Sequence, residues 1–355
     1  MASVASVELR RLTKTSDAEP PDLRSPRGDE TRYSSRKWKN GKMRVVVLDD
    51  YQGVAASCAD WTGLDCDVTF IEQHLGSAAD VIGALDEAEV VVAMRERTTF
   101  DASVLDRLPG LRLLVTTGMR NASIDLAAAA RNEIAVCGTR SPGHATAELA
   151  FAFVQLLARG LTAEIESVET GGWQVGLGRD LRGATLGVVG LGRLGSQVAQ
   201  LGQAFGMDVL SWSENLDAAR AEELGVRAVP RAELFENADF ISVHLRLSER
   251  TRRLIGADEF AMMKSDAFLI NTSRGAIVDQ DALLAAVRSG SIGGAGIDVF
   301  DQEPLRPDHP FRRERRILAT PHIGYVTRET YEVFYSDVVE DIAAWIAGSP
   351  IRVLG

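Results

Sequence analysis

Residues 185–199 read Thr185-Leu-Gly-Val-Val-Gly190-Leu-Gly192-Arg-Leu-Gly195-Ser-Gln-Val-Ala199. An apolar run of β type leads into three glycines and then into a helical pattern. The first glycine permits a tight turn, the second lets backbone approach a pyrophosphate, and the third lets the helix pack closely on the strand. This spacing also occurs by chance in loops, but the strand before it and the helix after it favour a dinucleotide site. The sequence therefore predicts a nucleotide cofactor with its phosphates at the helix N-terminus.

Length and composition exclude several classes of protein. The chain has 355 residues, of which 45% are hydrophobic, so it is long enough for two domains with separate cores. Its formal net charge of -11 argues against nucleic acid as a partner, because proteins that bind a polyanion normally carry a basic face. No apolar run reaches the length of a membrane span, and Cys58, Cys66 and Cys137 lack metal-ligand spacing. We expect a cytoplasmic protein with reduced thiols, no metal and no contact with membranes.

Residues 1–42 differ in composition from the rest of the chain. They are rich in Ser, Pro and charged residues, with hardly any apolar periodicity beyond residues 4–12. Such a segment cannot bury enough apolar surface to stay ordered, so we expect a disordered leader. A start assigned too far upstream, a targeting arm and a flexible tail are the alternatives. The first is favoured, because the segment is neither acid-poor nor amphipathic as transit peptides are.

From Met43 onward, strand-like and helix-like segments alternate in two successive series. Strand-like runs lie at 44–50, 68–72, 89–94, 111–117 and 134–137 in the first series, and at 185–189, 209–212, 240–245, 268–272, 295–300 and 317–319 in the second. This alternation predicts parallel sheets covered by helices on both faces. We therefore predict an α/β protein of two doubly wound parallel-sheet (Rossmann-like) domains, residues 43–142 and 143–324, with a cofactor cleft between them.

Two long helical patterns lie outside the alternating segments. One runs from residue 145 to 170, between the two domains, and is ended by Gly171-Gly172. The other runs from residue 327 to 347, with an apolar stripe formed by Tyr331, Phe334, Val338, Ile342 and Ile346. Because the first series lacks a closing element, we expect this last helix, within residues 325–355, to return to the first domain and complete it.

Three predicted strand ends in the second domain carry polar residues that packing alone would not select. They read Asn271-Thr-Ser-Arg274-Gly, Asp298-Val-Phe-Asp-Gln-Glu303-Pro and Thr320-Pro-His322-Ile-Gly. Ligands bind beyond the carboxyl ends of strands in doubly wound sheets, so these side chains can converge beside a nicotinamide ring. Arg offers a planar fork for a carboxylate and a keto oxygen, His gives or takes a proton, and a carboxylate behind the His stabilises its charged form.

Each of these residues also has a simple structural interpretation. Singly, Arg274 is a surface charge, Glu303 a first-turn helix residue and His322 a loop histidine. Their joint occurrence after a dinucleotide motif favours a catalytic site instead.

The ordered strings resemble those of the D-isomer-specific 2-hydroxyacid dehydrogenase family, over residues 43–355. The resemblance implies that Arg274 binds and polarises the substrate, that His322 is the acid/base, and that Glu303 orients and charges the His. Members of this family are usually dimers that associate through the cofactor domain, so the resemblance also implies a homodimer.

The resemblance implies that residues 143–324 of this chain bind NAD or NADP. Ser242-Val-His244-Leu looks like the family's strand end beside the cofactor cleft, and Asp298 looks like the anchor of the nicotinamide amide, with a cap or loop role as the alternative for both. The complete predicted set of cofactor-binding residues is Gly190, Gly192, Arg193, Leu194, Gly195, Ser213, Glu214, His244, Thr272 and Asp298.

One departure from the family concerns the acidic residue expected about twenty positions beyond the glycines, which holds the adenosine ribose of NAD. The chain reads Val209-Leu-Ser-Trp-Ser213-Glu214-Asn there, and the family's usual aspartate aligns best with Ser213. Ser213 has no charge to repel a 2′-phosphate, while Glu214 lies one residue further on and can still reach the ribose. The choice between NAD and NADP stays open.

Residues 43–142 would supply the substrate site, where the family holds the substrate carboxylate with loop backbone amides. The matching loops read Met94-Arg95-Glu-Arg-Thr and Thr117-Gly118-Met-Arg-Asn. We therefore predict that Arg95, Gly118 and Arg274 bind the substrate. Both loops are unusually charged, which indicates a polar or second-carboxylate substrate unless their arginines are simply solvated.

These observations predict an NAD(P)-dependent oxidoreductase that interconverts a small 2-oxo acid and its D-2-hydroxy acid. Hydroxypyruvate or glyoxylate reduction, phosphoglycerate oxidation, and formate or phosphite oxidation are the alternatives within the family. Formate oxidation is disfavoured, because that branch has an amide in place of Glu303. The alternative from another class is a non-catalytic nicotinamide sensor or transcriptional corepressor, which would need only the cofactor half and no catalytic residues.

Overall fold

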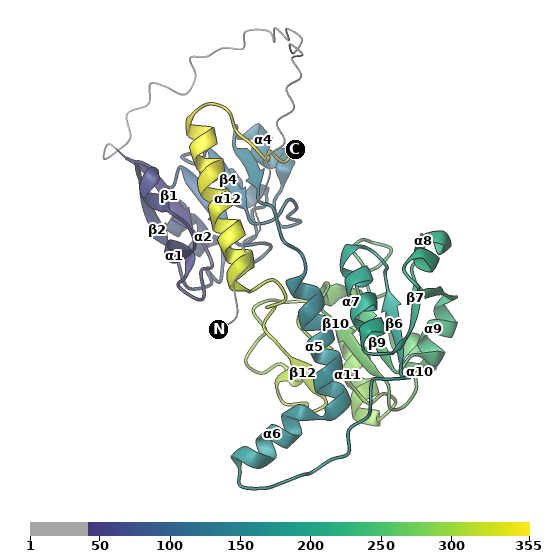
Figure 1. The fold of residues 1–355 in the computed structure, drawn as a ribbon. Helices are drawn as coiled ribbons and strands as arrows, with labels where there is room; N and C mark the ends of the chain where they lie inside the picture. The colour runs from purple at the N-terminus through teal and green to yellow at the C-terminus, as the bar shows by residue number, and fades with distance from the viewer. Residues whose placement is uncertain (1–41) are drawn as a thin grey trace, which may run out of the picture.

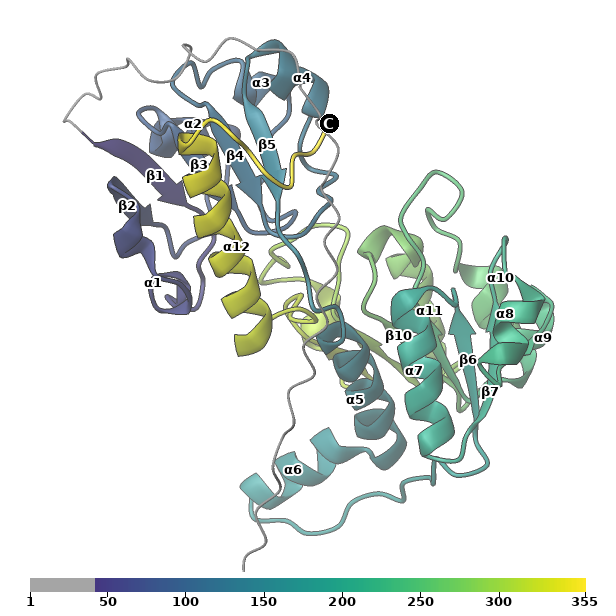
Figure 2. The same cartoon turned by 45° about the horizontal axis from the view of Figure 1, so that its top comes forward.

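The computed structural model describes residues 42–355, so the predicted leader lies outside the described residues except for Lys42. Two parallel β-sheets occupy separate halves of the molecule (Figures 1 and 2). Each sheet is covered by helices on both faces. The predicted α/β class with two Rossmann-like parallel-sheet units is confirmed.

The first sheet has the strand order β2-β1-β3-β4-β5, and all of its pairs are parallel. Its elements are β1 Met43–Val47, α1 Ala55–Cys58, β2 Cys66–Phe70, α2 Ala78–Leu85, β3 Val90–Ala93, α3 Ala102–Leu105, β4 Leu113–Thr116, α4 Leu126–Arg131 and β5 Ala135–Gly138. Val45 and Val47 pack into one apolar layer, whereas Val46 packs into the layer on the opposite face. Because both faces are buried, the strands read as continuous apolar runs.

The last helix, α12 (Arg328–Ile346), lies against β4, β5 and α1 of the first sheet (Figure 2). Tyr331, Phe334, Val338 and Ile342 are buried, but Ile346 is 45% exposed, so its predicted place on the buried stripe is wrong. Trp345, one residue earlier, closes the stripe instead, because Ile346 lies at the margin of the stripe in the last turn. No helix within residues 42–355 combines the length and apolar character needed to cross a membrane.

The second sheet has the strand order β12-β11-β10-β9-β6-β7-β8, again with parallel pairs. Its elements are β6 Thr185–Val189, α7 Arg193–Ala204, β7 Asp208–Trp212, α8 Ala218–Glu223, β8 Arg227–Ala228, α9 Arg231–Asn237, β9 Phe240–Val243, α10 Ala257–Met262, β10 Phe268–Asn271, α11 Gln280–Ser289, β11 Gly294–Ile297 and β12 Ile317–Ala319. Strand order reverses between β6 and β9, which is where a doubly wound sheet opens a ligand crevice. Strand β8 was not predicted from the sequence, because a strand of two residues is too short to show an apolar periodicity.

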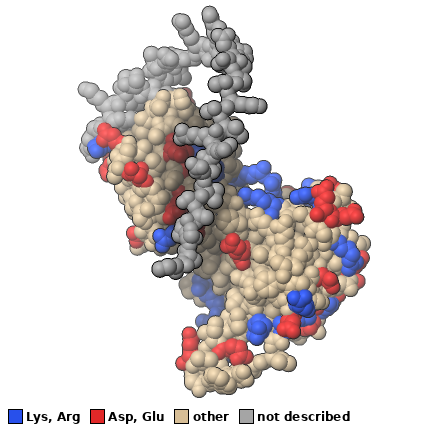
Figure 3. Space-filling view, viewed as in Figure 1, with Lys and Arg blue, Asp and Glu red and all other residues tan. Residues whose placement is uncertain are grey.

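The helical pattern at 145–170 forms two helices, so the prediction of one continuous helix is wrong. Helix α5 (Ala145–Arg159) packs against β10, β11 and α7, and α6 (Leu161–Glu169) follows after Gly160. Gly160 has a φ of 58°, the left-handed conformation that ends helices and that glycine adopts without strain. No residue of α6 is buried. The helix projects from the rest of the molecule (Figure 1), and acidic side chains lie on this projecting end (Figure 3).

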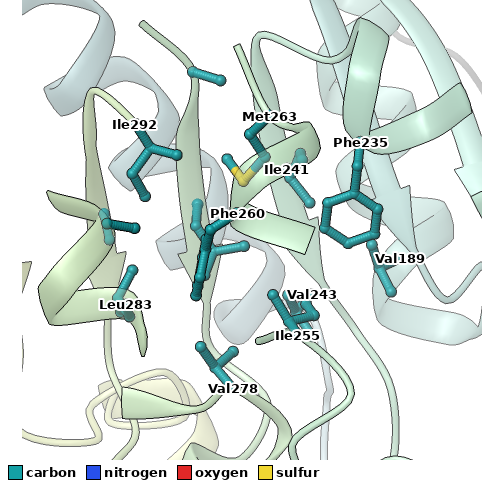
Figure 4. Packing of buried hydrophobic residues seen from close by; sticks show 14 of the residues in the cluster. Val189, Phe235, Ile241, Val243, Ile255, Phe260, Met263, Val278, Leu283 and Ile292 are labelled. Atoms are coloured by element: carbon teal, nitrogen blue, oxygen red, sulfur yellow. The ribbon is translucent and has the colours of Figure 1, made fainter. Parts of the chain in front are cut away.

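An apolar layer supports the site from one face of the second sheet. Figure 4 shows Ile241 and Val243 of β9 packed with Phe260 and Met263 from the α10 region. A fully buried side chain of this size contributes about 1.5–3 kcal/mol through removal from water. This packing fixes the carboxyl ends of β9, β10 and β11, from which the loops of the candidate site leave.

Candidate active site

His322 and Glu303 form the central contact of the site. They follow neighbouring strands of the second sheet, β12 and β11. His322 Nδ1 lies 2.6 Å from Glu303 Oε2, and Glu303 Oε1 accepts a hydrogen bond of 2.8 Å from the Phe300 amide. When Nδ1 carries the proton, it donates a hydrogen bond to the Glu303 carboxylate, and Nε2 is left to exchange a proton with a ligand. The structure thus brings together two of the three predicted catalytic residues.

Asp298 lies behind the loop that carries His322. Its side chain has no exposed surface, its Oδ1 accepts from the Thr320 hydroxyl and from the Ile323 amide (2.8 Å), and its Oδ2 accepts from the Gly324 amide (2.8 Å). The structure therefore shows Asp298 holding this loop, and its contact with the nicotinamide amide stays a prediction. The loop needs this support, since His322 has a left-handed φ of 53°.

Arg274 faces the first domain across the cleft. Its Nη1 donates to the Ser273 carbonyl (2.7 Å), and its Nη2 donates to Glu96 Oε1 (2.7 Å). Asn271 steadies the backbone, because its amide donates to the Arg274 carbonyl (3.0 Å). The guanidinium thus has one local anchor and one anchor that is 178 residues away in sequence. Its remaining N–H groups can bind a carboxylate.

Glu96 is a site residue that the sequence reasoning missed. Burial alone would raise its pKa, but the guanidinium groups of Arg95 and Arg274 and the charge of His322 hold the pKa of Glu96 below its ordinary value. Glu96 is therefore ionised at neutral pH and links the two domains electrostatically. A signal existed in the sequence: an acidic residue between two arginines directly after a buried strand.

Arg97 follows Arg95 and Glu96 in the loop after β3, and we call these three residues the charged wall of the first domain. Its Nη1 donates to a backbone carbonyl of the loop after β1 (2.6 Å), and its guanidinium lies 4.3 Å from the centre of the Tyr51 ring and 5.6 Å from that of Tyr325. Tyr325 contacts the His322 ring edge to face, with centroids 5.5 Å apart. Tyr51, Arg97 and His322 are among the residues that line a cavity of about 790 Å³. Neither tyrosine belongs to a motif, so no local signal predicted its place.

Gly118 lies in the loop after β4. Its φ is 86°, and its amide donates to Thr139 Oγ1 (2.7 Å) rather than pointing free into the cleft. A Cβ at this position would overlap Arg95 Nη1, which donates to the Thr117 carbonyl (3.1 Å). Glycine at position 118 therefore makes room for the Arg95 side chain, and its contact with a substrate stays a prediction.

The three predicted phosphate-site glycines meet at the switch point of the second sheet. Gly190 has a φ of 99°, and a Cβ on Gly195 would overlap the Gly190 carbonyl, so both positions require glycine. A Cβ on Gly192 would meet no protein atom within 4 Å. Gly192 precedes α7, whose N-terminus has no side-chain cap. The residues present therefore fit a dinucleotide phosphate, which would take this open space and the free N–H groups.

Arg193 and Leu194 begin α7 and bring their amides to the same end of the helix. The Arg193 side chain is exposed, and its guanidinium lies against Gly143, where a Cβ would overlap it. Leu194 packs against an apolar cluster of the second domain. The two residues thus offer backbone to a phosphate, while their side chains contact the protein.

Ser213 and Glu214 lie beside the glycine turn. The Gly190 amide donates to the Trp212 carbonyl (2.8 Å), which brings the end of β7 next to the end of β6. Ser213 is half-buried and Glu214 is exposed. The adenosine ribose of a dinucleotide occupies this position in Rossmann-like domains.

His244 and Thr272 follow β9 and β10, the next strands of the sheet. His244 Nε2 lies 2.8 Å from Ser242 Oγ, and burial lowers the pKa of His244 to about 4, so its ring is neutral. Among the described residues, the buried atoms His244 Nδ1 and Thr272 Oγ1 have no hydrogen-bond partner. Unpartnered polar atoms at two adjacent strand ends fit a polar ligand. Within residues 42–355, no three His, Cys, Asp or Glu side chains form a group that could hold a metal ion.

Comparison with known proteins identifies the relatives of this chain. Residues 151–324 match the family model described as "D-isomer specific 2-hydroxyacid dehydrogenase, NAD binding domain". A glyoxylate reductase from Korarchaeum cryptofilum is 38% identical over 257 residues, which cover 70% of this chain and 77% of the relative.

Two further relatives carry phosphoglycerate in their names. A D-3-phosphoglycerate dehydrogenase from Archaeoglobus fulgidus is 34% identical over 87% of this chain, which spans 58% of that protein's length. The solved structure of a phosphoglycerate oxidoreductase from Vibrio cholerae O395 superposes with a TM-score of 0.81 at 34% identity, over 86% of this chain and 100% of that one. The chain belongs to the D-isomer-specific 2-hydroxyacid dehydrogenase family, NAD(P)-dependent oxidoreductases that interconvert a 2-oxo acid and its D-2-hydroxy acid.

Proposed function

We propose that His322 transfers the proton in this reaction, that Arg274 binds the substrate carboxylate, and that Glu303 holds and charges the histidine. When bound, the nicotinamide supplies a hydride to the carbonyl carbon in the reductive direction. His322 gives its Nε2 proton to the carbonyl oxygen as the alkoxide develops. Glu303 stabilises the imidazolium that this step consumes. The observation that carries the proposal is the 2.6 Å contact between His322 Nδ1 and Glu303 Oε2.

The two halves of the molecule would divide the work. Residues 43–142 with α12 would form the substrate wall, because Glu96 contacts Arg274 across the cleft and Arg97 lies against Tyr325 on the same side. Residues 143–324 would hold the cofactor along the glycine turn and the strand ends. Closure of the two halves would then exclude water from the reacting carbon.

The substrates expected for this chain are a smaller set than all the 2-oxo acids that the family reduces. Relatives carry the names glyoxylate reductase and D-3-phosphoglycerate dehydrogenase, which act on small polar acids. The charged wall around Arg95 and Arg97 supports a small polar 2-oxo acid for this chain. The test is a panel of glyoxylate, pyruvate, hydroxypyruvate, phosphohydroxypyruvate and oxaloacetate with NADH and with NADPH. Tight cofactor binding without turnover of any of them would contradict the proposal and favour a nicotinamide sensor.

Cofactor selectivity follows from the residue after β7. In Ser213→Asp, a carboxylate would accept from the ribose hydroxyls and repel a 2′-phosphate, so we expect the NADH-to-NADPH affinity ratio to rise by about 10- to 100-fold. Ser213→Asn is the neutral control and should change the ratio much less. Fluorescence titration of both reduced cofactors measures it. If the parent already excludes NADPH as completely as Ser213→Asp does, Glu214 supplies the acidic contact instead.

A homodimer is also part of the proposal. The projecting segment consists of α6 and the residues after it, up to residue 177. It exposes large apolar side chains that are costly to leave in water, namely Ile165, Val168, Trp173, Val175 and Leu177. The most extreme is Leu177, whose side chain is fully exposed. We propose that a second copy covers this segment.

Leu177→Asp tests the dimer, because a charge in a buried interface costs several kcal/mol. We expect the parent to be a dimer by light scattering at micromolar concentration, and Leu177→Asp to dissociate at that concentration. Ile351→Asp, at an exposed apolar residue outside this segment, is the matched control and should remain dimeric. A monomeric parent would rule the dimer out.

A further inference from the structure

Glu96 belongs to the first domain but takes part in the site of the second. The loop that carries it is fixed on both sides of the residue. The side-chain amide of Asn121 donates to the Arg95 carbonyl, and the backbone amide of Arg97 donates to the Met94 carbonyl (3.2 Å). This loop directs the Glu96 carboxylate across the cleft to Arg274 Nη2 at 2.7 Å. Glu96 therefore adjoins the group that binds the substrate carboxylate.

The hydrogen-bonding capacity of this carboxylate is largely unfilled. Oε1 accepts from Arg274, but Oε2 is buried and has no hydrogen-bond partner among the described residues. Arg95 Nε, at 3.7 Å from Oε2, is too far for a hydrogen bond. An ionised carboxylate oxygen without a donor is costly to bury, so it marks a place where a ligand can supply one.

The surrounding charges select the kind of donor. Arg95 and Arg274 lie on either side of the carboxylate, so an ammonium group on the ligand would be repelled by two cations. A second carboxylate would be repelled by Glu96 itself. A neutral hydroxyl meets neither penalty and donates to an ionised oxygen, which makes a strong hydrogen bond.

The position of such a hydroxyl follows from the proposed function, on which this inference rests. Arg274 holds the carboxylate at C1 and His322 faces the oxygen at C2, so the substituent at C3 is the part of the substrate that remains to be recognised. We propose that Glu96 is a specificity-determining residue that accepts a hydrogen bond from a hydroxyl at C3 of the 2-oxo acid. The enzyme then prefers 3-hydroxy-2-oxo acids to analogues without the hydroxyl.

Steady-state kinetics with hydroxypyruvate and pyruvate test this preference. We expect the parent to favour hydroxypyruvate in kcat/KM by about 10- to 100-fold, the range of one charge-assisted hydrogen bond. Glu96→Ala should remove most of this ratio, mainly through KM for hydroxypyruvate, and Glu96→Gln, which keeps an acceptor oxygen without the charge, should retain part of it. Glu222→Gln, at an exposed position of α8, is the matched control.

A binding measurement separates this inference from the proposed function. D-glycerate and D-lactate differ by the same hydroxyl, and calorimetric titration into the complex with reduced cofactor measures their dissociation constants without turnover. Tighter binding of D-glycerate to the parent, lost in Glu96→Ala, supports the role of Glu96. Equal losses for both acids, or a parent without preference, overturn it and leave Glu96 with only the orientation of Arg274. Failure of the parent to reduce any 2-oxo acid overturns the proposed function, while the titration still decides the role of Glu96.

Discussion

His322→Ala should lower the maximal rate of 2-oxo acid reduction by roughly 10² to 10⁴-fold, because the group that protonates the developing alkoxide is missing. Affinity for the reduced cofactor should stay close to that of the parent, since the glycine turn and the ends of β7, β9 and β10 are untouched. Stopped-flow measurement of cofactor oxidation gives the rate, and fluorescence titration gives the affinity. A variant that keeps most of its rate would exclude His322 as the proton donor.

Glu303→Gln is the matched variant for the same step, because it keeps the shape of the side chain and removes the charge. The maximal rate should fall less than in His322→Ala, since the acid itself is present. The rate should still fall below that of the parent, because the amide carries no charge beside His322 Nδ1, which lies 2.6 Å from the Glu303 carboxylate. A Glu303→Gln variant with the rate of the parent at saturating cofactor would show that Glu303 is not coupled to the proton-transferring group.

Gly192→Val should weaken binding of the reduced cofactor by about 100-fold or more, because the side chain would take the space of the pyrophosphate and block its backbone hydrogen bonds. The fold should survive. A Cβ at Gly192 meets no protein atom within 4 Å, and the φ of -77° is open to any residue. Calorimetric titration with NADH and NADPH measures the loss, and an unchanged affinity would mean that the phosphates bind elsewhere.

Gly195→Ala is the informative contrast, because its Cβ would overlap the Gly190 carbonyl within the protein itself. Thermal unfolding should therefore begin at a lower temperature in Gly195→Ala than in Gly192→Val. Equal thermal stability of the two variants would show that the glycine turn can relax, and the separation of packing and ligand roles would not hold.

Local patterns in the sequence determined the elements of the fold and most of the strand-end loops. Apolar runs buried on both faces identify parallel strands without knowledge of their neighbours, and the glycines at 190 and 195 report backbone that allows no side chain. The strings that contain Arg274, Glu303 and His322 were equally readable, because each lies directly after a strand and the carboxyl ends of parallel strands share one edge of the sheet.

Tertiary structure alone decided which partners these residues have. The ion pair between Arg274 and Glu96 joins residues 178 positions apart, and the Asp298 carboxylate accepts from two amides of the loop that carries His322. Gly118 gives its amide to Thr139, a choice that depends on where β5 ends beside β4. Periodicity reports burial along one segment, whereas a contact across a cleft depends on how two separately packed domains meet. The residue types of the candidate site could therefore be predicted from the sequence, whereas the partners of their charged groups could not.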